Sequence, residues 1–499
     1  MKFNYRRFFE ILPGSLAWIT LLGMVFFSWQ FPAAVSIFII LFDIYWLLKT
    51  IYLSLHLKST YSEMKRAMKA DWFAKLKNEN LEWENIHHLV VLPMYKEPFS
   101  VVKESLESLL RANYDLKKMF VVLATEEAGG HEGFETAELA KKEFGSRFEE
   151  FLITIHPKGL PGETPGKGAN ESWGTKEAKI LILDKRDILP ENVLVSSFDV
   201  DTQILPEYFG CLTYKFLTAE NPLRAVYLPI PLFTNNVYED PAIARVISFS
   251  STFWQMMQQS RPERLTTFSS QSIPLPVLLD INYWQKDVVS EDSRIFWQAY
   301  LHYNSEFRVV PMFYPVSMDA NVAPTLWGTM KNLYKQQRRW GWGSENVPYM
   351  LEGFRKNKKI AFGKKAFWTF TVLEGFHSWA TNSIMIFALG WLPVMLGGSD
   401  FNSSLLSYSL PNVTRLIIQL SMLGIASSAI LGIALLPPKP KWFRKRHYIL
   451  YVLQWAIIPV TLIIFGAIPG LEAQTRLMFG GKWRLGFWVT PKGRKALSN

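Results

Sequence analysis

The position of its apolar segments constrains the fold of this chain more than any other feature. Residues 11–29 carry no charge, and residues 31–55 contain only Asp43 and Lys49 as charged side chains. Three further apolar segments lie near the C-terminus, at 367–396, 416–436 and 448–468. Because about 20 apolar residues span the hydrocarbon core of a bilayer, the pattern predicts membrane helices on both sides of a soluble region.

The N-terminal pair of segments is expected to form a transmembrane hairpin over 1–58. A cleaved signal peptide is the alternative for the first segment, but no small-residue cleavage site is visible and a second apolar run follows at once. Lys2, Arg6 and Arg7 favour a cytoplasmic N-terminus by the positive-inside rule. The chain then returns to the cytoplasm and continues into an amphipathic linker over 59–84.

The C-terminal region, 363–470, carries two conflicting signals. Three full crossings would place the C-terminus outside the cell, whereas the basic tail over 471–499 favours a cytoplasmic end. We therefore expect one segment to be re-entrant or interfacial. The segment around Pro459 is the candidate, because proline interrupts a helix. Since Pro-kinked spans also occur, a full crossing there stays open.

Charge and cysteine content exclude other classes of protein. The formal net charge is +11, but Lys and Arg cluster beside apolar segments, as in KFNYRR at the start and KPKWFRKRH at 439–447. No sequence-readable nucleic-acid module accompanies them, so we expect a membrane protein with no nucleic-acid partner. Cys211 is the one cysteine, which excludes an intramolecular disulfide and disfavours a cysteine metal site.

The soluble region alternates strand-like and helix-like patterns. Apolar runs predict buried strands at 88–94, 119–124, 151–155 and 193–198. Helical periodicity falls between them, at 99–111 and 132–144. This alternation predicts an α/β domain over 85–322, with a mixed, mostly parallel sheet and helices on its faces.

Asp199 and Asp201 directly follow the last of these strands, in the sequence SSFDVDT. Ligands of such sheets bind beyond the carboxyl ends of the strands, so the two acids are candidates for a binding site. An ordinary acidic turn is the plain alternative. Four other motifs are each weak alone: VVLPMYKEP at 90–98, PGKGAN at 165–170, SED at 290–292 and QQRRW at 336–340. Taken alone, PGKGAN is a flexible loop whose lysine is usually solvated, and SED is usually just the cap of the helix that follows. QQRRW would more often be a membrane-surface anchor, although Gln336, Arg339 and Trp340 share one face if the segment is helical.

In this order and spacing, the five motifs resemble those of membrane-bound family-2 glycosyltransferases, the group of cellulose and hyaluronan synthases and ceramide glucosyltransferase. The resemblance covers about 85–345 and the layout of flanking membrane segments. It implies a GT-A-like catalytic domain on the cytoplasmic side of the cell membrane, followed by interfacial helices over 323–362. It also implies inverting transfer of a sugar from a nucleotide-sugar donor, with a UDP-linked donor expected.

The C-terminal tail adds a second resemblance. FWVTPKG at 487–493 is similar to the FxVTxKG gating loop of cellulose synthases, with Phe487, Val489, Thr490 and Lys492 in the matching positions. The resemblance implies a segment that closes over the nucleotide from the cytoplasmic side. A disordered basic tail is the alternative.

The family resemblance implies a role for each motif. Asp201 would hold Mg²⁺ or Mn²⁺, with Asp199 nearer the ribose or phosphates, and Asp292 would be the general base. Glu291 would support the base from beside it. The nucleotide-sugar donor would contact residues of the first motifs: Pro93, Tyr95, Glu97 and Lys167. The diphosphate or the acceptor would contact the residues of QQRRW: Gln336, Arg339 and Trp340.

Two departures from the family pattern bear on substrate identity. After the second strand the family usually has an aspartate for the nucleotide base, whereas VVLATEEAGG offers Glu126 and Glu127. The stretch before SED lacks the glycine-rich acceptor motif. A growing polysaccharide is the expected acceptor, and a single addition to a lipid is the alternative. A catalytically silent membrane scaffold or transport partner is the rival class, against which the acids at 201 and 292 argue.

Overall fold

One mixed sheet forms the core of the soluble region. In residues 4–490, which the computed structural model describes, eight strands lie in the order β3-β2-β1-β4-β7-β6-β8-β5. Their bounds are β1 His87–Pro93, β2 Met119–Glu126, β3 Glu150–His156, β4 Val193–Ser197, β5 Gln203–Ile204, β6 Ala225–Leu232, β7 Gln271–Pro274 and β8 Arg308–Ser317. The neighbours β3, β2, β1 and β4 are parallel, as are β6 and β8, whereas β7 is antiparallel to both of its neighbours and β5 is antiparallel to β8. The predicted mixed, mostly parallel sheet is confirmed.

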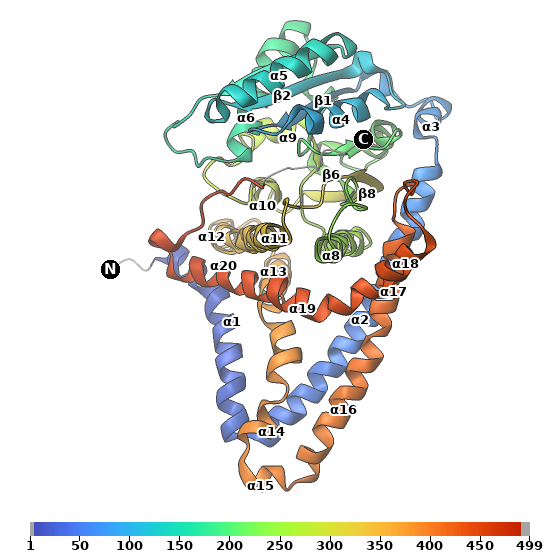
Figure 1. Ribbon diagram of the computed structural model, residues 1–499. Helices are drawn as coiled ribbons and strands as arrows, with labels where there is room; N and C mark the ends of the chain where they lie inside the picture. Colours follow the sequence, from blue (N-terminus) through green and yellow to red (C-terminus); the bar gives the residue numbers. More distant parts are fainter. Residues whose placement is uncertain (1–3, 491–499) are drawn as a thin grey trace.

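Helices cover both faces of this sheet (Figure 1). They are α4 Phe99–Leu110, α5 Gly130–Phe144 and α7 Tyr208–Leu217 on one face, and α6 Lys167–Ala178, α9 Leu275–Asp280 and α10 Glu291–His302 on the other. Alternate residues of β1 explain this two-sided burial: Val90 and Leu92 pack with the first set, and Leu89 and Val91 pack with the second. A strand buried on both faces is continuously apolar, as HLVVLP is.

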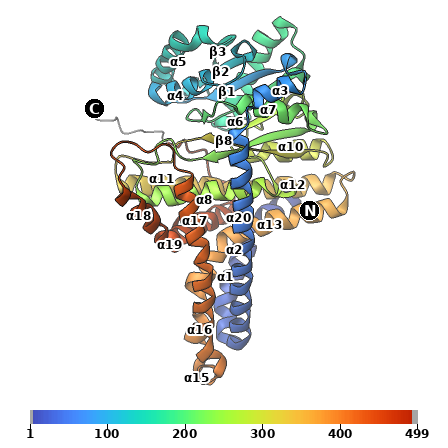
Figure 2. The same ribbon diagram turned by 90° about the vertical axis from the view of Figure 1, so that its right-hand side faces the viewer.

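Helices α8 (Ala242–Gln259), α11 (Leu326–Gly341) and α12 (Asn346–Lys356) lie between the sheet and the apolar helices (Figures 1 and 2). Helix α2 (Pro32–Lys69) runs unbroken from the apolar helices to the α/β domain, where α3 (Trp72–Asn78) follows it. The hydroxyl of Thr60 donates to the backbone oxygen of Met256 in α8 at 2.7 Å. The expected boundary at residue 58 is therefore not a break in the helix.

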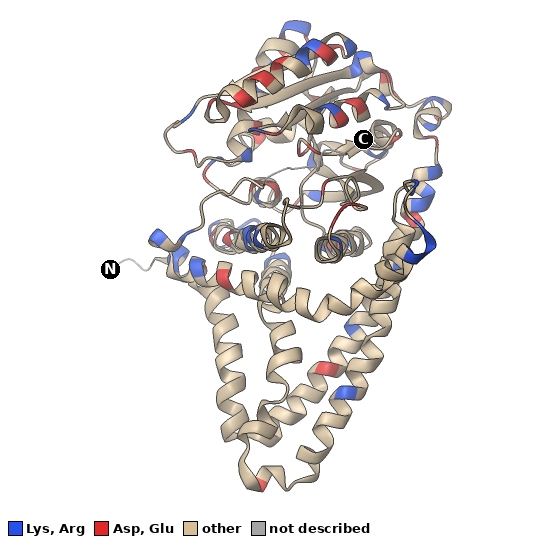
Figure 3. Cartoon of the chain, viewed as in Figure 1, with Lys and Arg blue, Asp and Glu red and all other residues tan. Residues whose placement is uncertain are grey.

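Four helices of the described part are long and apolar enough to cross a membrane: Tyr5–Gln30, Pro32–Lys69, Leu405–Ala434 and Lys445–Phe479. The first is α1, the second α2, and the third comprises α16 (Leu405–Ser421) and α17 (Leu423–Ala434). Helix α13 (Phe362–Ile384) lies between α1 and α2 in Figure 1, and the chain continues from it to α14 (Leu392–Leu396) and α15 (Gly398–Asn402) at the far end of the bundle. These helices form one apolar bundle below the α/β domain (Figure 3).

The fourth apolar segment is oriented differently from the others. Its helices α18 (Lys445–Leu453), α19 (Ile458–Leu462) and α20 (Ile468–Phe479) run crosswise beneath the α/β domain in Figure 1. Pro459 and Pro469 stand in the first turns of α19 and α20, where a missing backbone donor is tolerated and the preceding helix stops. Helix α20 packs against α1 and α11. The segment around Pro459 thus follows a different course from the other three long apolar helices.

Candidate active site

The acidic turn after β4 is held by main-chain contacts. Val200 is buried in the core, and its backbone oxygen accepts a hydrogen bond from Ser105 at 2.6 Å. Asp201 is fully buried, and its Oδ2 accepts from the backbone N–H of Asp319 at 3.1 Å. Asp199 is the accessible member of the pair, with 27% of its side chain exposed and its Oδ2 accepting from Ser269 at 2.8 Å. The two carboxylates therefore occupy different depths at the end of one strand.

Lys167 joins the distant motifs at one point. Its Nζ lies 2.9 Å from Asp199 Oδ1, 3.0 Å from Asp292 Oδ1 and 3.3 Å from Glu171 Oε1. The sequence predicted a lysine on a flexible loop, but Lys167 is the first residue of α6 and its side chain is only 10% exposed. Burial alone would lower the pKa of this ammonium, yet the surrounding carboxylates, including Glu291, raise its pKa well above the ordinary value. Lys167 therefore stays charged and ties the DVD and SED motifs together.

Two buried glutamates complete this cluster. Glu171 accepts a hydrogen bond from Ser197, and burial raises the pKa of Glu171 to about 7 although Lys167 opposes the shift. Burial and the neighbouring Asp292 raise the pKa of Glu291 well above its ordinary value. A Cβ at Gly168 would lie 2.8 Å from the Cβ of Glu291, so only glycine allows α6 and α10 to approach this closely. Sequence reasoning missed Glu171, whose position four residues after Lys167 was the available signal.

Asp292 stands in the first turn of α10, and one glutamate holds the loop before it. Glu345 Oε1 accepts from the backbone N–H of Val289 at 3.0 Å, and from the N–H and hydroxyl of Ser290 at 2.9 and 2.7 Å. The indole N–H of Trp342 donates to the other oxygen of Glu345 at 3.0 Å. This carboxylate, which the sequence did not single out, fixes where α10 begins.

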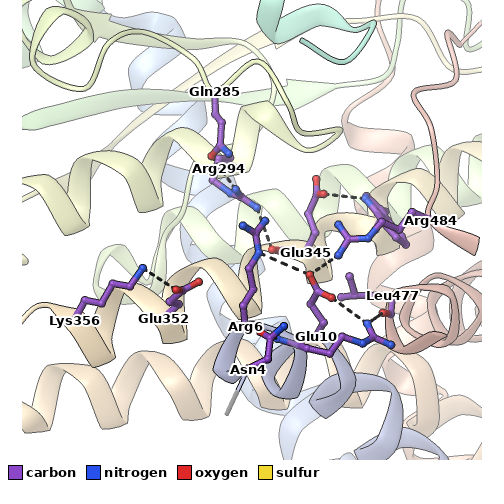
Figure 4. A network of polar contacts seen from close by, with 12 residues as sticks. Asn4, Arg6, Glu10, Gln285, Arg294, Glu345, Glu352, Lys356, Leu477 and Arg484 are labelled. Carbon is purple, nitrogen blue, oxygen red and sulfur yellow. Dashed lines mark hydrogen bonds and ion pairs between the residues drawn. The ribbon is translucent and has the colours of Figure 1, made fainter. Parts of the chain in front are cut away.

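Arg294 braces the same junction from α10. It donates to Asn346 at 2.6 Å, to Gln285 at 2.8 Å and to the backbone oxygen of Glu345 at 3.0 Å, and Figure 4 shows it between the last two residues. Its guanidinium lies 4.2 Å from the centre of the Tyr349 ring. The start of α12 is thereby bonded to the helix that carries Asp292.

The predicted helical face of QQRRW exists on α11, and its residues point to different neighbours. Arg339 lies 5.5 Å from the ring centre of Phe487, and its Nε has no hydrogen-bond partner among the described residues. Trp340 packs against the rings of Phe233 and Phe268, with centroids 6.4 and 6.0 Å away. Gln336 lies one turn earlier and is half-buried. By contrast, Arg338 pairs with Glu472 of α20 at 2.8 Å, so it anchors the helix.

The C-terminal tail returns to this region. Arg484 pairs with Glu10 of α1, as Figure 4 shows, and the chain then runs to Phe487. A Cβ at Gly166 would lie 3.2 Å from the Phe487 ring, so the ring touches the loop before Lys167. Val489 is exposed and Thr490 is half-buried. Lys492 lies outside the described residues.

The predicted nucleotide residues lie at the ends of β1 and β2. Pro93 ends β1, and Glu97 accepts from the backbone N–H groups of Tyr95 at 2.7 Å and Lys96 at 3.1 Å, which closes the turn. Burial, with the neighbouring Glu97, raises the pKa of Glu126 to about 7. Glu127 instead bonds the chain after β3: its Oε2 accepts from the backbone N–H of Lys158 at 2.8 Å. Of the two glutamates, Glu126 is therefore the one whose carboxyl group is influenced by Glu97.

The donor atoms present fit a hard cation only in part. No group of three or more His, Cys, Asp or Glu side chains among residues 4–490 is arranged to hold a metal ion. Asp199 and Asp201 offer carboxylate oxygens, which Mg²⁺ commonly combines with substrate phosphates instead of a full protein cage. The described residues therefore offer an incomplete set of ligands for a hard cation.

Comparisons with known proteins give distant likenesses of the fold. No protein-family model and no curated protein matches the chain. The mannosyltransferase PcManGT from Pyrobaculum calidifontis, solved with GDP-Man and Mn²⁺, is 12% identical, with 82% of this chain and 99% of that chain covered and a TM-score of 0.38. S. aureus TarS 1-349, solved with UDP-GlcNAc, is 11% identical, with 69% and 90% covered and a TM-score of 0.37.

Proposed function

We propose that this chain is a membrane-embedded inverting glycosyltransferase that uses a nucleotide-sugar donor, with a UDP-linked donor expected. The observation that carries the proposal is the ammonium of Lys167 within 3.0 Å of both Asp199 and Asp292. A strand-end carboxylate and a helix-start carboxylate, which are far apart in sequence, thus border one small polar space. Transfer from a nucleotide sugar needs a cationic place for the leaving diphosphate and a base for the attacking hydroxyl, side by side.

The donor side of this space would hold the diphosphate. Lys167 supplies a permanent positive charge, and the guanidinium of Arg339 has an unpartnered N–H that can bond a phosphate oxygen. Asp199 and Asp201 would hold Mg²⁺ or Mn²⁺, which supplies positive charge to the leaving diphosphate when bound. Glu126 and Glu97 lie at the neighbouring strand ends, where Glu126 would accept a hydrogen bond from the nucleotide base.

The acceptor side would be organised by Asp292. Its carboxylate is 23% exposed and its Oδ1 is engaged with Lys167. When a diphosphate draws the ammonium of Lys167 away, the Oδ1 of Asp292 is released to accept the proton of the acceptor hydroxyl. Trp340 would offer a flat face to the acceptor sugar. Attack from the side opposite the leaving group inverts the anomeric carbon.

The membrane arrangement of the proposal has four crossings. They are α1, α2, α13 and the α16–α17 pair. This set differs from the four helices that are long and apolar enough to cross, because α13 takes the place of the crosswise segment Lys445–Phe479, which is proposed to lie at the interface. An even number of crossings leaves both termini on one side, which agrees with the basic residues at both ends of the chain. The α/β domain would then be cytoplasmic, at the cell membrane.

A growing polysaccharide is the proposed acceptor. The contact of Phe487 with Gly166 and Arg339 supports this choice, because it brings the segment resembling a polymerase gating loop to the site. A single addition to a lipid is the second candidate, favoured by the position of α11 and α12 directly above the apolar bundle (Figure 1). The acids at 201 and 292 argue against the silent-scaffold alternative, and Asp292 lies 3.0 Å from the ammonium of Lys167.

Turnover of a donor panel tests this proposal. The purified chain in lipid nanodiscs would be given nucleotide sugars with Mg²⁺ or Mn²⁺, with and without a lipid extract and oligosaccharide acceptors. We expect metal-dependent release of a nucleoside diphosphate from one donor. Product size and lipid dependence then separate polymer from glycolipid. No release from any donor, with folded protein and both acceptor classes present, would overturn the proposal.

A further inference from the structure

We propose that a groove between α1, α12 and α13 binds one membrane phospholipid with an anionic headgroup. The groove has a volume of about 860 Å³ and is separate from the residues assigned to sugar transfer. Its apolar walls come from all three helices and include Leu16, Leu351, Phe354, Phe362, Phe370 and Leu373. This volume lies within the range of pockets that take small organic ligands.

One end of the groove is cationic, and its only nearby carboxylate among the described residues is Glu352, which pairs with Lys356 and is also influenced by Arg355. Arg355 of α12 and Lys365 of α13 line it, and neither forms an ion pair with a carboxylate in residues 4–490. Arg355 lies 4.5 Å from the ring centre of Tyr5, and Lys365 donates to the backbone oxygen of Asn357 at 2.7 Å. The next residue shows the contrast, because Lys356 pairs with a carboxylate of its own helix at 2.7 Å. The open cationic end therefore favours an anionic group.

The opposite end is already satisfied by protein contacts. Glu374 pairs with Lys49 of α2 at 3.0 Å, and His377 is 2.9 Å from the hydroxyl of Thr20. Neither side chain therefore needs a polar partner from a ligand. Between Lys365 and His377 the groove follows α13 for about 18 Å, which is close to the depth of one leaflet. A ligand that matches both ends has an anionic head and an apolar chain.

The surroundings identify the source of such a ligand as the membrane. Phe362 and Phe370, at the rim, are 83% and 69% exposed, which is expected of side chains that face lipid and not water. Figure 3 shows Lys and Arg concentrated at the level of α12 and α20, with few charges on the helices below. Anionic lipids of the cytoplasmic leaflet are attracted to basic residues at this level.

Bound lipid would also hold α12 in place. The start of this helix is bonded to α10, since Asn346 accepts from Arg294 at 2.6 Å and donates to Ser293 at 2.8 Å. A ligand that binds only the folded protein raises its resistance to unfolding. Phosphatidylglycerol should therefore raise the midpoint of thermal unfolding more than phosphatidylcholine does.

The test compares two double variants of the full-length protein. Arg355→Gln/Lys365→Gln removes the cations that line the groove, and Lys358→Gln/Lys359→Gln removes the same charge from exposed neighbours outside it. Nanodiscs of phosphatidylcholine with or without phosphatidylglycerol give the unfolding midpoints, and native mass spectrometry counts retained lipid. We expect the groove variant to bind phosphatidylglycerol about tenfold more weakly and the control to bind like the wild type.

A third variant tests the apolar part without changing charge. Ala366→Trp should fill the groove and displace the lipid chain, and size-exclusion chromatography shows whether each variant is folded. Equal loss of lipid in the two double variants, or no lipid retained by the wild type, would overturn the proposal. So would a midpoint shift by free glycerol phosphate as large as that by phosphatidylglycerol, because the site would then bind a soluble anion. None of these measurements depends on sugar transfer.

Discussion

Asp199 and Asp201 follow a strand inside an eight-stranded sheet, whereas Asp292 begins a helix that side chains hold in place. We call the ends of β2 and β4, with Glu126, Asp199 and Asp201, the strand-borne half of the site. The helix-borne half comprises Asp292 on α10, Arg339 on α11 and the tail at Phe487. Main-chain pairing within the sheet fixes the first half.

The helix-borne half depends on elements that belong to the membrane region. Glu472 of α20 accepts from Arg338 and from Tyr334, at 2.8 and 2.7 Å, and so fixes α11. The tail is tied to α1 through Arg484 and Glu10. We therefore expect donor binding to persist when the packing of the apolar bundle is disturbed, and we expect turnover to fall.

The largest effects are expected from substitution of one acid in each half, and the two variants should differ in nucleotide binding. Asp201→Asn and Asp292→Asn should each lower turnover by about 10³-fold, because in the proposed function each of these charges acts on the reacting groups. Asp201→Asn should also abolish metal-dependent binding of a nucleoside diphosphate, whereas Asp292→Asn should retain it. Turnover assays and calorimetric titration with Mn²⁺ measure both properties. Asp280→Asn, at an exposed acid bonded to Tyr303, is the control. Equal loss of nucleotide binding in both site variants would contradict the division.

A smaller effect is expected from the carboxylate that positions the base. Glu345→Gln removes the charge that accepts from the N–H groups of Val289 and Ser290. We expect kcat to fall roughly 10–100-fold with the donor KM unchanged, since only the helix-borne half moves. Steady-state kinetics on both substrates measure this split. The matched change Glu352→Gln, on a residue that pairs with Lys356, should leave both constants unaltered. A rise in donor KM with kcat preserved would show that Glu345 serves the other half.

Adjacent arginines on α11 offer an internal comparison. Arg339→Gln should lower kcat/KM about tenfold and leave the unfolding midpoint unchanged, because its guanidinium faces the site. Arg338→Gln should lower the unfolding midpoint by a few degrees, because it breaks the pair with Glu472. Thermal unfolding and donor turnover, measured on both proteins, give the two results. If Arg338→Gln lowered kcat/KM and Arg339→Gln lowered the unfolding midpoint, Arg338 and not Arg339 would belong to the site.

An effect on stability alone is expected in the strand-borne half. The pKa of Glu126 is raised to about 7 by burial, so the folded protein holds its proton in a range where the unfolded chain has released it. The stability from this proton is complete below about pH 4.5 and is lost as pH rises through about 7. Glu126→Gln should therefore raise the free energy of unfolding at pH 8 by on the order of 1–3 kcal/mol and leave it unchanged at the acidic end. Denaturant titrations at both pH values measure the free energy of unfolding. An increase of the same size at both pH values would contradict burial of the Glu126 carboxylate as its cause.

The sequence was informative where residue type and local order decide the structure. Continuous apolar runs identified β1, β2 and β4, because burial on both faces leaves no polar alternation. SED was expected before a helix, and Ser290 precedes α10 while Glu291 and Asp292 form its first turn. QQRRW was expected on a helix, and α11 contains it. Lys167, Asp199 and Asp292, which came from three separate motifs, meet within 3.0 Å.

Contacts between remote segments were not readable in the same way. Glu345 lies 55 residues from Ser290, and no spacing rule links the two. Lys167 was expected on a flexible loop but is buried at the start of α6. Only the folded cluster of carboxylates around it explains that burial. The segment 445–479 is apolar enough to span a membrane, and its crosswise course depends on packing against α1 and α11. Such features follow from tertiary packing and not from residue pattern.

The most direct test is a structure of the protein in nanodiscs with a nucleoside diphosphate and Mn²⁺. The central claim is that Lys167 occupies the place between donor and base, and yields to the diphosphate. We predict metal density between Asp199 or Asp201 and the diphosphate, with the Lys167 ammonium moved from Asp292 to a phosphate oxygen. A nucleotide bound elsewhere, with Lys167 still paired to both Asp199 and Asp292, would contradict the account.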